Sequence, residues 1–147
     1  MSITVGQIIR NKSDVWSVAP DATVFTALEI MAEKDIGALV VMLDEKLVGI
    51  FSERDYARKV ILRGRSSKTT TVGELMTKDV FTVTPETSIR ECLTLATEKR
   101  FRHLPVVSKG KVVGMVTIGD IVKAIISDQQ SMIDQMENYI TGRGYGR

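Results

Sequence analysis

The chain has 147 residues, of which 44% are hydrophobic, 26% are charged and one is cysteine. A chain of this length can fold as one compact domain that buries roughly two-thirds of its unfolded surface, and its composition excludes a largely disordered protein. The formal net charge of +2 is too small to indicate by itself that the protein binds nucleic acid or a membrane surface.

The N-terminal stretch, MSITVGQIIRNKSDVW, lacks the features of a secretory leader. It has no long apolar run behind a basic segment, and nowhere in the chain do about eighteen uncharged apolar residues follow one another. We therefore expect a protein of the reducing cytoplasm with no membrane partner. In that compartment the glycosylation sequon at Asn11 has no meaning, because glycosylation requires secretion.

The next segment alternates short strands with helices. Val15–Val18 is predicted to be a strand that ends before Pro20, because proline has no amide hydrogen to donate. An amphipathic helix follows, since apolar residues recur at helical spacing. They are Val24, Ala27, Leu28, Met31 and Ala32. The stretches ALVVML and LVGIF, on either side of DEK, predict two strands and a turn. A second helix begins near Asp55.

The whole pattern is then written a second time, 65 residues later. Val15–Val60 aligns with Val80–Ile125 without a gap, and Asp55 falls on Asp120. Ser88 and Glu91 are spaced as a capping box for the helix of the second copy. One copy of some fifty residues is near the lower limit for independent stability. The duplication therefore predicts an α/β (α+β) fold of two strand-helix-strand-strand-helix repeats, packed sheet to sheet about a pseudo-twofold axis.

The sequence divides into four parts. They are a first repeat at residues 5–63, a polar linker at 64–71, a second repeat at 72–126, and a helical extension with a flexible tail at 127–147. The closing helix of the second copy is expected to reach Ile140, far beyond its own repeat. We favour packing of this helix against a second chain in a homodimer, and the alternative is a fold back onto its own chain.

Two short motifs, GIFSERD and GMVTIGD, carry the polar groups that stand out. Ser52 with Asp55, and Thr117 with Asp120, have the spacing of a helix cap, in which a hydroxyl accepts from a backbone amide and a carboxylate suits the helix dipole. The same atoms also suit a mononucleotide, because a helix N-terminus with a hydroxyl binds phosphate and a carboxylate can accept from both hydroxyls of a ribose. The glycine before each hydroxyl would allow a ligand to approach the backbone.

These motifs resemble the glycine, hydrophobic, x, Thr or Ser, x, x, Asp signature of the cystathionine-β-synthase (CBS) domain. MTKDVFTVTPETSI and FRHLPVV are similar to the rest of its second copy, and the resemblance spans about residues 5 to 126. It implies a tandem CBS pair, or Bateman module, similar to the stand-alone CBS-pair proteins. Such a module would be a non-catalytic sensor that binds AMP, ADP, ATP or NAD(H) between its repeats, needs no metal, and signals to an unknown regulated protein.

The resemblance also assigns roles to individual residues. Asp55 and Asp120 would hold ribose hydroxyls, Ser52 and Thr117 would meet phosphate, and Thr77 would lie near the base. The remaining candidate ligand-binding residues are Gly37, Ala38, Arg54, Arg102, His103, Pro105, Ile118 and Gly119.

The two copies differ at several of these positions. Where the second copy has Arg102, His103 and Pro105, the first has Gly37, Ala38 and valine; where the first has Glu53 and Arg54, the second has Ile118 and Gly119. An arginine can clamp phosphate, whereas a glutamate opposes it. We therefore expect two sites of unequal affinity.

Other classes of function have weaker support in the sequence. One histidine and one cysteine do not supply a nucleophile, base and orienting group, and Cys92 lies on an apolar helix face, which predicts a core residue. The module could instead serve only as a dimerisation scaffold. Nucleic-acid binding is the third alternative, and the absence of interleaved aromatic residues in the basic run at Arg58, Lys59, Arg63 and Arg65 argues against it.

Overall fold

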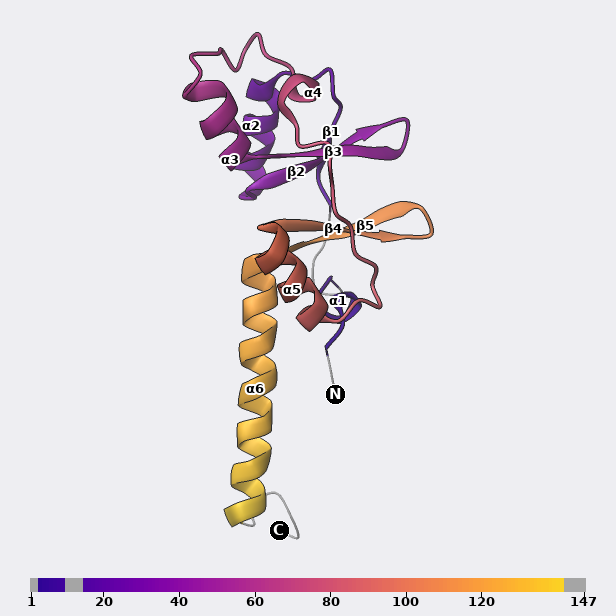
Figure 1. The fold of residues 1–147 in the computed structure, drawn as a ribbon, viewed down its shortest axis with the longest axis vertical. Coiled ribbons are helices and arrows are strands. Elements are labelled where there is room, and N and C mark those ends of the chain that lie inside the picture. Colours follow the sequence, from indigo (N-terminus) through magenta and orange to yellow (C-terminus); the bar gives the residue numbers. More distant parts are fainter. Residues whose placement is uncertain (1–2, 10–14, 142–147) are drawn as a thin grey trace.

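The computed structural model describes residues 3–9 and 15–141 of the chain. Figure 1 shows two units whose sheets face each other in the middle of the body while their helices lie on the outer sides. The sequon at Asn11 and the tail at residues 142–147 lie outside the described residues. Within those ranges, no helix has the length and apolar character needed to cross a bilayer.

The first unit is a three-stranded sheet covered by helices. β1 (Ser17–Val18) pairs in parallel with β2 (Ala38–Leu43), and β2 pairs antiparallel with β3 (Lys46–Ser52). α2 (Val24–Lys34) connects the two parallel strands. This order of elements confirms the strand-helix-strand-strand pattern predicted for the first copy.

The second unit repeats this build with a smaller sheet. α5 (Ile89–Lys99) precedes an antiparallel hairpin of β4 (His103–Ser108) and β5 (Lys111–Thr117). The register of this hairpin matches that of β2 and β3 residue for residue at the 65-residue offset, including the irregularity after the fourth pair. The duplication seen in the sequence is therefore a duplication of structure.

The 65-residue repeat predicts a second strand at Val80–Val83, the counterpart of Val15–Val18, and this strand is reduced to a single bridge. Only Val83 pairs with β4, and its N–H donates to the carbonyl of Pro105 at 3.0 Å. In the first unit the corresponding pairing of β1 with β2 has one further hydrogen bond, which the N–H of Val40 donates to the carbonyl of Trp16 at 3.3 Å. Pro105 takes the place of Val40 and has no N–H to donate, so the ladder stops one bond earlier.

Both main helices begin at a capped position and bury one stripe. The hydroxyl of Thr23 accepts from the amide of Thr26 at 3.1 Å, and the hydroxyl of Ser88 accepts from the amide of Glu91 at 3.1 Å. The predicted stripe of α2 is confirmed in most positions. Val24, Ala27 and Met31 are buried and Leu28 is half-buried, whereas Ala32 is exposed.

Each unit has its own hydrophobic core, and Cys92 belongs to the second. Its side chain is fully buried among Val5, Leu104, Val106 and neighbouring apolar residues. Burial, with a smaller contribution from the charge of Glu91, raises the pKa of the Cys92 thiol to about 11. The thiol is therefore neutral at physiological pH, which confirms the prediction of a core residue.

The two units exchange the short helices that precede each repeat. α1 (Val5–Ile9) begins the chain but packs on the second unit, where the N–H of Val5 donates to the carbonyl of Thr87 and the N–H of Gly6 to that of Pro85, both at 2.8 Å. Val5 is fully buried in the core of the second unit.

α4 (Val72–Leu75) makes the reciprocal contact. It precedes the second repeat in sequence, yet the N–H of Val72 donates to the carbonyl of Ala22 and the N–H of Gly73 to that of Pro20, both at 2.8 Å. Val72 is fully buried in the core of the first unit. Each core is thus completed by the helix that precedes the other repeat in the sequence.

The exchange explains the glycine in each motif and corrects its interpretation. A Cβ on Gly49 would lie 2.5 Å from Sδ of Met76 and 3.0 Å from the carbonyl oxygen of Thr77, and a Cβ on Gly114 would lie 3.0 Å from Cγ2 of Ile9. The sequence-based interpretation, that these glycines admit a ligand, is therefore wrong. The absence of a side chain leaves room for the exchanged segments: Met76 and Thr77 lie against Gly49, and Ile9 lies against Gly114.

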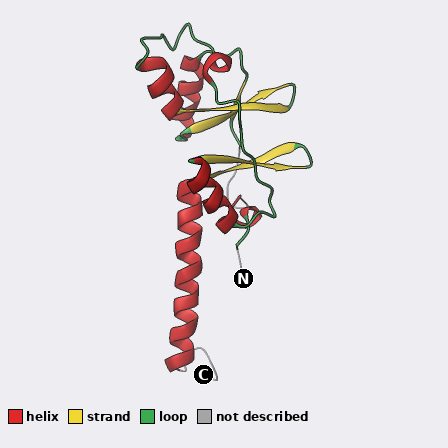
Figure 2. Cartoon of the chain, in the orientation of Figure 1, coloured by secondary structure: helices red, strands yellow, loops and turns green. Residues whose placement is uncertain are grey.

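The closing helices of the two repeats differ in length. α3 (Glu53–Asp55) continues into η1 (Tyr56–Ile61), which has π-helical hydrogen bonding, whereas α6 (Ile118–Thr141) is a single helix of 24 residues. Figure 2 shows α6 running well past the other helices of the second unit. The long helix predicted to reach Ile140 is confirmed.

We expect Gly49→Ala to lower the free energy of unfolding by about 1–3 kcal/mol, because the new methyl group would force the backbone at Thr77 to move. Urea denaturation followed by circular dichroism measures this loss. Gly119→Ala is the matched control, since its Cβ would meet only Oγ1 of Thr117, at 3.6 Å, and alanine favours a helix over glycine by about 1 kcal/mol. Equal losses in both variants would contradict the packing role of Gly49.

Candidate functional site

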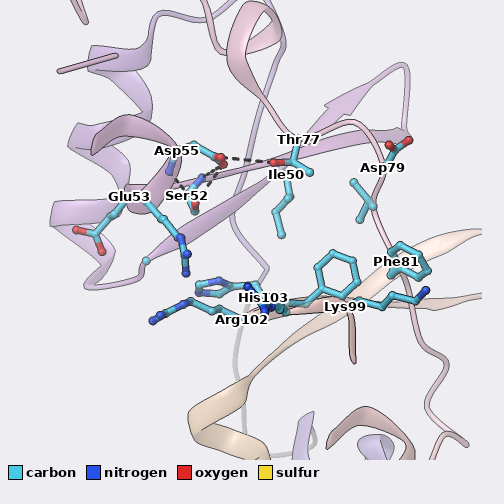
Figure 3. Close-up of a pocket in the computed structure, with 15 residues that line it drawn as sticks. Ile50, Ser52, Glu53, Asp55, Thr77, Asp79, Phe81, Lys99, Arg102 and His103 are labelled. Atoms are coloured by element: carbon cyan, nitrogen blue, oxygen red, sulfur yellow. Dashed lines mark hydrogen bonds between the residues drawn. The ribbon is translucent and has the colours of Figure 1, made fainter. Parts of the chain in front are cut away.

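A cavity of about 450 Å³ opens between the two units. In Figure 3 the end of β3 and the start of α3 form one side, and the residues around the start of β4 form the other. Its lining residues are Gly37, Ile50, Ser52, Glu53, Arg54, Asp55, Thr77, Asp79, Val80, Phe81, Lys99, Arg100, Phe101, Arg102 and His103. We call this space the first cavity.

Seven of the thirteen predicted site residues line the first cavity. They are Gly37, Ser52, Arg54, Asp55, Thr77, Arg102 and His103. The first four come from the first repeat and the last three from the second, so residues about 50 positions apart, such as Ser52 and Arg102, meet at one site. The facing arrangement of the two units creates this juxtaposition.

Ser52 and Asp55 form a complete capping box at the start of α3. The amide of Asp55 donates to Oγ of Ser52 at 3.1 Å, and the amide and hydroxyl of Ser52 donate to Oδ2 of Asp55 at 3.0 and 3.1 Å. The capping interpretation of this motif is therefore realised in the structure.

The other carboxylate oxygen of Asp55 is also engaged. Lys59 places its Nζ 3.1 Å from Oδ1 of Asp55 and donates to the carbonyl of Leu75 at 3.1 Å, while the hydroxyl of Thr77 donates more weakly to Oδ1 at 3.4 Å. Asp55 thus joins the start of α3 to the end of α4 and to the segment after it. Its carboxylate positions these elements around the first cavity.

Thr117 and Asp120 repeat the cap at the start of α6. The amide of Asp120 donates to Oγ1 of Thr117 at 3.1 Å, and the amide of Thr117 donates to Oδ2 of Asp120 at 2.9 Å. The position that matches Lys59 is Ala124, so the lysine that approaches Asp55 is replaced by alanine in the second repeat. The two motifs share a cap and differ in their surroundings.

Four cationic and three acidic side chains line the first cavity: Arg54, Lys99, Arg100 and Arg102, and Glu53, Asp55 and Asp79. Arg58 first, then partial burial and Arg102, lower the pKa of Arg54, and Asp55 opposes this shift. Among the described residues, no carboxylate lies within ion-pair distance of Arg54 or Arg102, and the same holds for Lys99. Cations that repel one another at a cavity favour an anionic ligand.

One end of the first cavity is apolar. The rings of Phe81 and Phe101 have centroids 4.7 Å apart and are tilted by 43°, and Figure 3 shows Ile50 pointing toward them from the first unit. Sequence reasoning missed these residues. The internal repeat could have pointed to Phe81, because Phe81 and Lys99 align with Trp16 and Lys34 of the first repeat. Nζ of Lys99 lies 5.9 Å from the centroid of the Phe81 ring, and Nζ of Lys34 lies 4.3 Å from the centroid of the Trp16 ring.

A second cavity of about 270 Å³ lies near the start of β2 and the end of β5. Its lining residues are Val15, Trp16, Asp35, Ile36, Gly37, Ala38, His103, Met115 and Thr117. It holds fewer cationic side chains than the first cavity and an aromatic ring, that of Trp16, where the first has Phe81. His103 lines both cavities.

Four of the thirteen site residues predicted from the sequence line neither of these two cavities. Pro105 is buried within β4, where its missing N–H ends the ladder with Val83. Ile118 and Gly119 are exposed on the first turn of α6, and Asp120 turns its carboxylate back to the amide of Thr117. Their predicted roles in ligand binding stay predictions.

Among the described residues there is no cluster of metal-binding side chains and no exposed cysteine thiol. No group of three or more histidine, cysteine, aspartate or glutamate side chains in these ranges could hold a metal ion. Cys92 is buried away from both cavities. The side chains that line the cavities suit binding.

Part of the basic run after α3 is tied into the fold. Lys59 pairs with Asp55, and Arg65 pairs with Glu74 at 3.3 Å. Hydrogen bonds from Thr71, and the nearby Arg65 guanidinium, lower the pKa of Glu74. These cations hold the linker onto the first unit, which weakens their interpretation as a nucleic-acid surface.

Comparisons with known proteins agree on one family. The model of the CBS domain matches residues 5–62 and 72–127. A relative from Arabidopsis thaliana, CBS domain-containing protein CBSX3, mitochondrial, is 39% identical over 155 residues, which cover 98% of this chain and 74% of the relative.

Solved structures give the same result. A proposed signal-transduction protein with CBS domains from Burkholderia ambifaria MC40-6 superposes with a TM-score of 0.82 at 48% identity, covering 86% of this chain and 96% of that one. The hexameric CBS-CP12 protein from bloom-forming cyanobacteria superposes with a TM-score of 0.76 at 29% identity, covering 83% of this chain and 71% of that one.

We expect Asp55→Ala to lower the free energy of unfolding by about 1–3 kcal/mol, because the cap is lost and the ammonium of Lys59 loses its carboxylate. Urea denaturation measures the loss. Asp79→Ala is the matched control, since Asp79 lines the same cavity but is exposed and forms none of the hydrogen bonds or ion pairs seen among the described residues. A loss as large at Asp79 would show that the cap of Asp55 contributes little.

Proposed function

The chain belongs to the CBS-domain family, and from this premise we propose that it is a non-catalytic sensor that binds an adenosine-containing ligand between its two repeats. The observation that carries the proposal is the first cavity, where Arg54 at the start of α3 and Arg102 of the second unit line the same space, each without a carboxylate within ion-pair distance among the described residues. The relatives named above include a proposed signal-transduction protein, which agrees with a regulatory role. AMP, ADP, ATP and NAD(H) are the candidate ligands.

The first cavity offers separate groups for each part of a nucleotide. Its volume of about 450 Å³ lies in the range of small-molecule sites. The apolar end at Phe81 and Phe101 suits a base, since aromatic rings stack on flat heterocycles. Arg54 and Arg102 suit phosphate, because guanidinium groups bind it through charge-assisted, often bidentate hydrogen bonds.

Binding at Asp55 would require an exchange of hydrogen bonds. Its four acceptor sites already receive Ser52 twice, Thr77 and Lys59. A ribose hydroxyl would replace the weakest of these, the 3.4 Å contact from Thr77 to Oδ1, and the hydroxyl of Ser52 would have to leave Oδ2 of Asp55 in order to donate to phosphate. The cap at the start of α3 would thus also be part of the ligand-binding site.

The second cavity would be the weaker or differently selective site. Its smaller volume of about 270 Å³ and the lack of an arginine in its lining disfavour a polyphosphate there. Thr117 and the ring of Trp16 still supply a hydroxyl and an aromatic surface. We therefore expect two unequal sites, both between the repeats at residues 5–63 and 72–126.

A ligand in the first cavity would touch both units at once. It would therefore favour the arrangement of the two units in which Arg102 and Ser52 can both contact it. A ligand shifts the equilibrium between two arrangements only by the difference in its affinity for them. A partner protein, not yet identified, would read the result. The cytoplasmic location stays a prediction, because the similar plant protein bears the name mitochondrial.

Thermal melts with a panel of adenine nucleotides test the proposal. A specific ligand at 100 times its dissociation constant should add about 2.7 kcal/mol to the free energy of unfolding. Arg102→Gln should weaken that ligand roughly 10- to 100-fold in a calorimetric titration, since a hydrogen bond to a charged group contributes about 1.5–3 kcal/mol. Arg63→Gln is the matched control, because Arg63 is exposed and lies outside the cavity lining.

The outcomes separate the proposal from its alternatives. If no nucleotide shifts the melting midpoint, the sensor function fails and a scaffold with capped helices remains. If Arg63→Gln weakens binding as much as Arg102→Gln, the ligand does not occupy the first cavity. Binding to oligonucleotides that disappears on neutralising Arg63 and Arg65 would favour the nucleic-acid alternative.

A further inference from the structure

The apolar surface of the protein is concentrated on one helix. Eight of the fourteen exposed large hydrophobic side chains of the described residues lie on α6. They are Ile118, Val122, Ile126, Met132, Ile133, Met136, Tyr139 and Ile140. Tyr139 and Ile140, at the far end, are 76% and 77% exposed, and Figure 1 shows this end standing clear of both units. An apolar face of this extent on a single element marks an interaction surface.

The spacing of these residues defines how the face would pack. One row, which we call the seam, alternates steps of four and three residues through Val122, Ile126, Gln129, Ile133, Met136 and Ile140. This spacing is the heptad pattern of helices that pair side by side. On one flank of the seam lie Ile125, Met132 and Tyr139, and on the other lie Lys123, Gln130 and Glu137, each set at steps of seven.

We propose that α6 pairs antiparallel with α6 of a second copy of this chain, along the seam and about a twofold axis at Ser131. The two flanks of the seam are centred one residue on either side of that point. Lys123 and Glu137 each lie seven residues from Gln130, and Ile125 and Tyr139 each lie seven residues from Met132. A symmetric interface requires this kind of relation, because each contact must occur twice with the two copies interchanged.

Charge selects the antiparallel orientation. Residues 127–141 carry three carboxylates and no cation, so a parallel pair would place two acidic segments side by side. The antiparallel pair places Lys123 beside the partner's Glu137, twice in each dimer. It also sets the helix dipoles in opposite directions, so that the N-terminus of each helix lies near acidic residues of the other.

The apolar flank selects the same orientation. An antiparallel pair brings Ile125 opposite the partner's Tyr139 and Met132 opposite the partner's Met132, so that apolar side chains meet one another. A parallel pair would instead place Met132 beside the partner's Glu137. Ile125 is half-buried against the core of its own unit, and the partner's helix end would therefore extend an existing core.

The oligomeric state of the full chain is the first test. Sedimentation equilibrium at micromolar concentrations should give a dimer for the wild type. Ile133→Asp should raise the dimer dissociation constant about 100-fold or more, because an unpaired carboxylate would be buried at the seam of both copies. Ser131→Asp adds the same charge on the opposite face of the same helix, and should leave the dimer intact.

Single cysteines test the orientation. Antiparallel pairing about Ser131 separates the two copies of position 132 by only about 3 Å along the helix axis and the two copies of position 136 by about 15 Å. Met132→Cys should therefore form a disulfide-linked dimer on mild oxidation, and Met136→Cys should not. The native Cys92 is buried and its thiol is neutral, so it does not interfere.

Three results would overturn the proposal. A wild-type monomer at these concentrations would exclude self-pairing, and a dimer that survives Ile133→Asp would place the interface on another surface. A cross-link at position 136 without one at position 132 would show a parallel pair. Nucleotide titrations on the Ile133→Asp variant keep this result separate from the sensor function, because the first cavity lies at the other end of the second unit and its lining is unchanged.

Discussion

The reciprocal exchange of α1 and α4 is the constraint on which the rest of the structure depends. Four backbone hydrogen bonds of 2.8 Å, from the first two residues of each helix, hold it on the opposite unit, and Val5 and Val72 fill the two cores. Neither core is complete without the helix that precedes the other repeat. The two sheets are therefore fixed face to face, and the first cavity exists because residues of both units border the space between them.

Within that frame, the cap at Ser52 and Asp55 links stability to binding. The carboxylate of Asp55 accepts from the start of α3 on one oxygen and meets Lys59 and Thr77 on the other. These bonds orient the groups that face Arg102 across the cavity, while the cations there have no carboxylate partner among the described residues. The protein itself orders these groups, and the arginines without a carboxylate partner would suit the anionic ligand that we propose.

α6 connects the proposed ligand sites to the proposed dimer contact. It starts at the cap of Thr117, beside the second cavity, and continues without interruption to Thr141. A helix is stiff over this length of about 36 Å, so one rigid element carries both a cavity wall and the apolar seam. The first repeat has no such extension, since its closing helix changes to π-helical bonding at Tyr56 and ends at Ile61. Only one of the two repeats can therefore join copies in this way.

The sequence by itself determined the repeat, the order of elements, the capped motifs and the long closing helix, because each of these depends on local periodicity, turn chemistry and spacing. It also identified Arg102 and Asp55 as candidates that the structure brings to one cavity. Only the tertiary structure decided that Gly49 accommodates the exchanged segment, and that Phe81 and Phe101 form an apolar wall. These features arise from contacts between residues far apart in the chain, and periodicity within one segment carries no record of which other segment will lie against it.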